Sequence, residues 1–172
     1  FGQGLGGLSP FLAGFLGASI SLGWVTAQLV SVRFDPRRAR RAIRVAPLGL
    51  TLALLAFAGL LVEQASPGRV LAWAVVLVLA GMAIGSAIPH LSVAALGASD
   101  DEDEAAKAAS ALSTTQLIAY AIASALTGVL VAVGDTLLES ARIMAIGLAG
   151  ITALGLITTT MLGRVTARAQ SS

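Results

Sequence analysis

The charged residues of this chain fall in tight clusters that are separated by long uncharged runs. No Asp, Glu, Lys or Arg occurs in five stretches, which cover residues 1–32, 45–62, 70–99, 108–134 and 143–163. The hydrocarbon core of a bilayer is about 30 Å thick, and a helix needs about 20 apolar residues to cross it. Each of the five runs can therefore hold one membrane-spanning helix.

Helix is the form of secondary structure that suits these runs. Inside a bilayer every backbone N–H and C=O must be paired within its own segment or within a closed barrel. Barrel strands are about 10 residues long and alternate in polarity, whereas these runs are longer and do not alternate. Only 12% of the 172 residues are charged, about half the share in a soluble domain. The sequence therefore predicts an all-α, polytopic membrane helix bundle with about five transmembrane helices.

The basic residues are distributed unequally between the two ends of these helices. We expect spans at 9–31, 44–62, 70–91, 108–133 and 142–162, loops at 32–43 and 92–107, and a tail at 163–172. Nine basic residues lie in or next to the loops and the tail, and only Arg69 and Arg142 lie on the other side. Because Lys and Arg concentrate in cytoplasmic loops, we expect the C-terminus to be cytoplasmic and the protein to lie in the inner (plasma) membrane.

Several kinds of chemistry have no residues to support them. The chain has no cysteine and one histidine, and no carboxylate lies within a span, so we expect no enzymatic activity, no metal and no cofactor. The arginines at 37–44 are a topology signal that could also bind the head groups of membrane lipids. They are not a nucleic-acid patch, because spans flank them on both sides. Ten Arg against one Lys indicates a GC-rich bacterial genome.

Several short patterns occur in a fixed order along the chain. Residues 3–14 contain Q-x-x-x-G-x-S-P-x-x-A-G, and Arg33-Phe34-Asp35-Pro36-Arg37-Arg38 follows the first span. Further on come G-x-x-x-G-x-x-x-P at 81–89 and A-S-A-L at 109–112. In this order, and with the expected topology, the chain resembles the C-terminal half of a major facilitator superfamily (MFS) transporter. Within that family it looks most like the drug:proton antiporters with fourteen spans.

The resemblance implies that the five spans are the last five of a transporter built from two pseudo-symmetric halves, with the substrate between them. The chain begins with Phe and shows no signal peptide, so we expect it to be an incomplete C-terminal half whose partner is the missing N-terminal half of the same transporter. The implied function is proton-coupled efflux of a small amphipathic molecule or drug by alternating access. A self-contained five-span subunit or homo-oligomer without transport activity of its own stays open as the alternative.

The motif after the first span departs from the family pattern. The family usually has an acidic residue before the Arg and a Gly after the Phe, where this chain has Val32 and Asp35. In the family this loop forms a charge network that latches one conformation. Although the motif departs from the family pattern in this way, the resemblance implies a gating role for Arg33, Asp35, Arg37 and Arg38.

Two spans carry polar side chains along one helical face. They recur at steps of three and four, as Ser21, Trp24, Gln28 and Ser31 in the first span and Ser113, Gln116, Tyr120, Ser124 and Thr127 in the fourth. Polar faces of membrane helices point at a partner helix or an aqueous cavity, and the resemblance implies that both spans face the cavity. We predict that Ser21, Trp24, Gln28, Gln116, Tyr120 and Ser124 line the path of a small-molecule substrate. The alternative is hydrogen bonding across packed helices.

Two further features carry weaker expectations. His90 is the only side chain that titrates near neutral pH, so it is a possible protonation site, with an interfacial histidine at a helix end as the alternative. The last span contains the small residues Gly147, Gly150, Ala153 and Gly155, which predict close helix packing at these positions.

Overall fold

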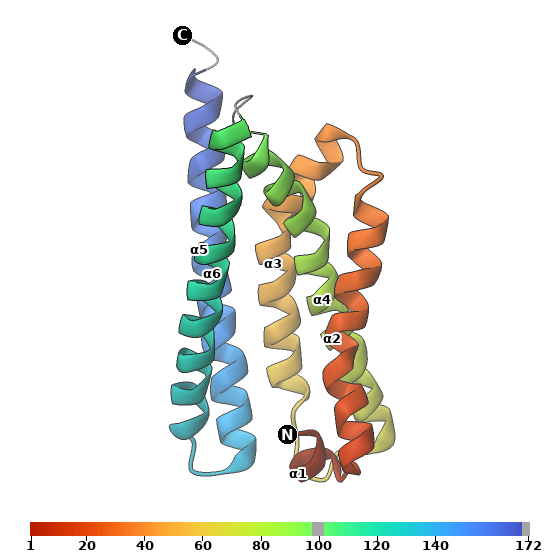
Figure 1. Ribbon diagram of the computed structural model, residues 1–172. Helices are drawn as coiled ribbons and strands as arrows, with labels where there is room; N and C mark the ends of the chain where they lie inside the picture. Colours follow the sequence, from red (N-terminus) through yellow and green to blue (C-terminus); the bar gives the residue numbers. More distant parts are fainter. Residues whose placement is uncertain (98–101, 170–172) are drawn as a thin grey trace.

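The computed structural model describes residues 1–97 and 102–169, except for the side chains at 95–96, 102 and 158–169. The described residues are helical apart from short connections. The elements are α1 (Gly2–Gly6), α2 (Pro10–Ser31), α3 (Pro36–Leu60), α4 (Pro67–Leu96), α5 (Glu102–Ala132) and α6 (Leu137–Ala169) (Figure 1). Helices α2 to α6 are each long and apolar enough to cross a membrane. The prediction of an all-α bundle with five such helices is therefore confirmed.

Three of the long helices begin with the same local chemistry. Pro10, Pro36 and Pro67 stand at the first helical position, where the missing N–H costs nothing. The hydroxyl of Ser9 accepts a hydrogen bond from the backbone N–H of Leu12 at 3.3 Å, and Asp35 Oδ1 accepts one from that of Arg38 at 2.8 Å. These side chains satisfy donors that a helix start leaves free.

The expected loops and tail are shorter in the structure than the charge pattern suggests. Helix α3 begins at Pro36, so the arginines at 37–44 form its first two turns and not a loop. Helix α4 continues to Leu96, and α6 continues to Ala169 within the expected tail. Arginine favours helix, so a charge marks where an apolar run ends and not where the helix ends.

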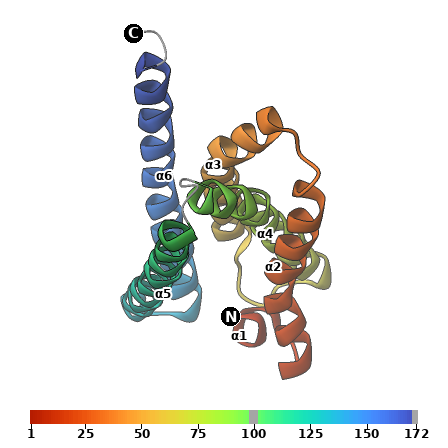
Figure 2. The same cartoon turned by 45° about the horizontal axis from the view of Figure 1, so that its top comes forward.

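Helix α4 lies in the middle of the arrangement. It packs against α2 on one side and α3 on the other, and α3 in turn packs against α6 (Figure 2). Helix α5 touches α6 and, less extensively, α4. The short α1 packs at one end of the bundle, beside the starts of α2 and α4.

A cluster of buried residues lies at the end of the bundle that holds α1. Leu5, Phe57, Leu61 and Trp73 are buried there together with Ala141 and Ala145. The rings of Phe57 and Trp73 meet edge to face, with their centres 6.3 Å apart, a favoured geometry for aromatic pairs. Elsewhere many large apolar side chains are exposed, among them Phe11, Leu29 and Leu117. A surface of this kind suits contact with lipid or with further protein.

Candidate transport surface

The glycine pattern of α4 brings the backbones of α2 and α4 into direct contact. A Cβ atom at Gly81 would overlap the carbonyl oxygen of Ile20, and one at Gly85 would lie 2.9 Å from the carbonyl carbon of Trp24. From the other side, a Cβ at Gly23 would overlap the carbonyl oxygen of Val78. Small residues at such spacing allow close approach of membrane helices. The pattern therefore holds α2 against α4. Helix α2 carries the first polar stripe, which consists of Ser21, Trp24, Gln28 and Ser31.

That stripe lies along the edge of the α2–α4 contact. Trp24 and Gln28 are half-buried, and Ser21 is exposed. Ser31 differs from the other three because it is fully buried, and its hydroxyl donates to the carbonyl of Gln28 at 3.0 Å. Ser31 therefore belongs to the helix contact, whereas Ser21, Trp24 and Gln28 reach the open surface.

The second polar stripe consists of Ser113, Gln116, Tyr120, Ser124 and Thr127 in α5. Of the five long helices, α5 is the one that the others bury least. No residue of the most apolar 18-residue window of α5 is buried. Ser113, Tyr120 and Ser124 are exposed, while Gln116 and Thr127 are half-buried. Thr127 donates to the carbonyl of Ala123 in its own helix. Within the described part of the chain, no side-chain hydrogen bond joins Gln116, Tyr120 or Ser124 to another helix.

The structure does not join the two stripes into one closed site. Helix α4 lies between α2 and α5 and packs against both (Figure 2). The aromatic and amide side chains of the two stripes therefore lie on helices that α4 separates. Whether they contact a substrate stays a prediction.

The proposed gating residues lie at the turn from α2 into α3. Asp35 caps α3, and its Oδ2 lies 3.6 Å from Nε of Arg38, with both side chains more than half exposed. Arg33 and Arg37 are also exposed. The structure thus gives Asp35 a local role as a helix cap, which the sequence pattern did not indicate.

His90 lies beside the same turn. Its ring stacks on Phe34, with the ring centres 5.9 Å apart and the planes 15° from parallel. Its Nε2 atom is buried and has no hydrogen-bond partner among the described residues. The fold therefore brings the aromatic residue of the loop motif together with the histidine. Sequence spacing could not reveal this pair, because 56 positions separate the two residues.

Comparison with known proteins relates the chain to transporters. No protein-family model and no solved structure matches the chain. Two proteins named probable multidrug-efflux transporter, from the CDC 1551 and H37Rv strains of Mycobacterium tuberculosis, are each 37% identical to it over 132 residues. The match covers 76% of this chain but 28% of each relative, so the chain spans little more than a quarter of their length. With its five apolar helices, the chain is therefore similar to part of a multi-pass efflux transporter.

Proposed function

We propose that this chain is part of a secondary active transporter that exports small amphipathic molecules by alternating access, driven by a proton gradient. The observation that carries the proposal is the polar stripe of α5, which the other described helices leave open. Polar groups on a helix that crosses a membrane are costly in contact with lipid. Such a stripe needs a protein partner or an aqueous path. A substrate path between two parts of a transporter provides both.

In this proposal the chain is the incomplete C-terminal transmembrane domain of an MFS transporter in the bacterial inner membrane. The missing N-terminal half would face α2 and α5, with the substrate held between the two parts. Trp24 and Tyr120 would enclose the apolar part of the substrate. Gln28 and Gln116 would donate or accept hydrogen bonds, with Ser21 and Ser124 beside them.

The residues of the α2–α3 turn have a conformational role in this proposal. Arg33, Asp35, Arg37 and Arg38 would change partners between the inward-open and outward-open states. The structure pairs Asp35 with Arg38 of its own helix, and in this proposal the rest of the transporter supplies the alternative partners. His90 stacks directly on this turn, so a proton on its ring would act on the gate.

The proposal is tested with the whole protein in inside-out membrane vesicles that lack other drug exporters. We expect an amphipathic cationic dye to accumulate when the vesicle interior is made acidic, and the accumulation to collapse on addition of a protonophore. A sodium gradient of equal size serves as the control for the coupling ion. Dye movement equal to that in vesicles without the protein would refute efflux, and accumulation driven by sodium alone would refute proton coupling.

A further inference from the structure

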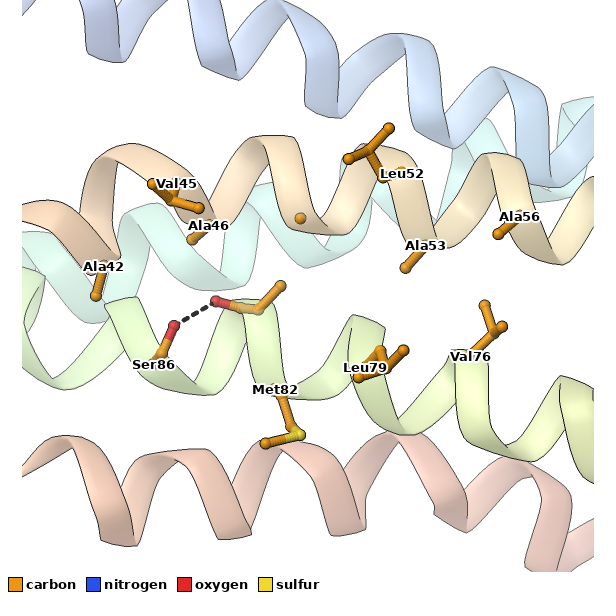
Figure 3. Close-up of a pocket in the computed structure, with 12 residues that line it drawn as sticks. Ala42, Val45, Ala46, Leu52, Ala53, Ala56, Val76, Leu79, Met82 and Ser86 are labelled. Carbon is orange, nitrogen blue, oxygen red and sulfur yellow. Dashed lines mark hydrogen bonds between the residues drawn. The ribbon is translucent and has the colours of Figure 1, made fainter.

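A shallow apolar groove of about 550 Å³ runs between α3 and α4 (Figure 3). Ala46, Gly49 and Ala53 line it from α3, and Leu79, Ala83 and Ser86 line it from α4. The small residues of α3 leave room between the helices, since several of them point toward α4. The hydroxyl of Ser86 donates to the carbonyl of Ala83 at 2.9 Å, so the one polar side chain named here is satisfied by its own helix. The groove therefore suits an apolar chain.

A second, smaller hollow extends this groove toward the start of α3. It measures about 360 Å³ and is lined by Phe34, Arg38 and Arg41, and it shares Ala42, Val45 and Ser86 with the first. The two hollows thus adjoin each other, and the two arginines that line the smaller one are exposed. The other arginines of α3 do not share this position. Steps of three and four residues put Arg38 and Arg41 on the groove face of α3, together with Ala42 and Val45. Arg37, Arg40 and Arg44 fall on another face of α3.

The length of the groove matches one leaflet of a bilayer. From Ser86 to Val76, α4 rises by about 15 Å at 1.5 Å per residue, which is about half of a hydrocarbon core of about 30 Å. The smaller hollow, with its two arginines, then lies at the level of the lipid head groups. It lies at the arginine-rich end of the bundle, and anionic lipids are concentrated in the cytoplasmic leaflet.

We propose that the α3–α4 groove holds an acyl chain of an anionic phospholipid whose phosphate is bound by Arg38 and Arg41. A guanidinium group can hold two phosphate oxygens at once. The ion pair of Arg38 with Asp35 joins Nε to Oδ2 at a long 3.6 Å, with both side chains exposed, so a phosphate can compete for the guanidinium. This site is separate from the polar stripes on α2 and α5, although it shares Arg38 with the proposed gate. It depends on the membrane location of the protein and not on its transport activity.

The test uses the whole protein, purified in detergent and titrated with phosphatidylglycerol or with phosphatidylcholine of the same acyl chains. Bound lipid is counted by native mass spectrometry. We expect phosphatidylglycerol to bind more tightly than phosphatidylcholine and the preference to fall about tenfold in the double variant R38Q/R41Q. The matched control is R37Q/R40Q, which removes the same charge from the same helix turns but from another face, and it should retain the preference.

A second measurement locates the acyl chain independently of charge. Phosphatidylglycerol with a photoreactive group in its acyl chain should form adducts with residues 42–56 of the wild-type protein, and A56F should reduce them by filling the far end of the groove. Equal loss of binding in both double variants would show a non-specific basic surface and overturn the proposal. Adducts elsewhere, or a groove covered by another part of the transporter or by a second copy, would also overturn it.

Discussion

Arg142 of α6 donates a hydrogen bond from Nη2 to the backbone carbonyl of Leu61, 2.8 Å away, at the end of α3. The preceding carbonyl, that of Leu60, accepts a bond from the indole N–H of Trp73 in α4 at 3.0 Å. A helix leaves its last carbonyls without partners in its own backbone. Side chains of α4 and α6 therefore donate hydrogen bonds to the last carbonyls of α3. These bonds link the three helices beside the buried cluster.

Replacement of Arg142 by Met should lower the free energy of unfolding by about 2 kcal/mol, the range for a hydrogen bond with a charged donor. This free energy is measured by denaturant unfolding in detergent micelles, followed by the fluorescence of Trp24 and Trp73. Arg69→Met is the matched control, because both arginines are exposed but the bond of Arg69 to the carbonyl of Leu60 is 3.5 Å long. Equal effects of the two substitutions would contradict a specific role for Arg142.

Gly81→Ala should separate α2 from α4, because the added Cβ would overlap the backbone carbonyl of Ile20. Overpacking at a fixed backbone costs about 1–3 kcal/mol, and the same unfolding assay measures the loss. Gly17→Ala in α2 meets nothing within 4 Å and should leave stability unchanged or slightly higher. If Gly81→Ala were as stable as wild type, the close contact between the two backbones would be wrong.

The stack between Phe34 and His90 should couple the two residues by about 0.5–1.5 kcal/mol, as aromatic pairs do. A double-mutant cycle of F34A, H90A and the double variant measures the coupling. His90→Phe keeps a ring in place but removes the titratable group. If His90 carries the coupling proton, H90F should fold normally yet lose transport driven by a pH gradient. Normal proton-driven transport by H90F would show that the stack is structural only.

The sequence predicts the helices of this chain better than their contacts. The uncharged runs identify the five apolar helices, because lipid exposure and the absence of charge go together. The packing face of α6 was less predictable. A Cβ atom added at Gly150 would meet nothing within 4 Å and one at Gly155 would lie 4.0 Å from Pro47, whereas one at Gly147 would overlap Leu130 of α5. Among the described side chains of α6, the buried ones are Ser140, Ala141, Ala145 and Ala149, since α6 uses a different face toward α3.

For the polar stripes too, the sequence predicts which residues share a helix face but not what that face contacts. Helical periodicity is sufficient to place Trp24 with Gln28, and Gln116 with Tyr120, on one face each. It could not show that Ser31 is buried in the contact with α4, or that α5 is almost uncovered, because both depend on neighbouring helices. The cap formed by Asp35 and the stack on His90 likewise depend on tertiary structure.

The proposed orientation predicts that the two ends of α3 label from opposite faces of the membrane. The chain has no cysteine, so Arg37→Cys and Ser66→Cys each introduce one reactive thiol at an exposed position. In intact cells a membrane-impermeant maleimide should label the residue at 66 and spare the one at 37 until the cells are opened. Labelling of both thiols from outside would contradict the topology.

The open stripe of α5 gives the most direct test of the substrate path. Tyr120→Ala in the whole transporter should change efflux severalfold for at least some substrates while expression stays normal, because the phenol is an exposed polar group in the apolar part of α5. Ile118→Ala is the matched control, since Ile118 and Tyr120 are both 56% exposed and point to opposite sides of the helix. Dye efflux and drug resistance of both variants are compared with wild type. If Tyr120→Ala transported every substrate as wild type does, or if Ile118→Ala were equally impaired, the stripe would not line the path. A loss confined to Tyr120→Ala, Gln116→Ala and their neighbours on the same face would separate recognition of the substrate from general damage to the helix.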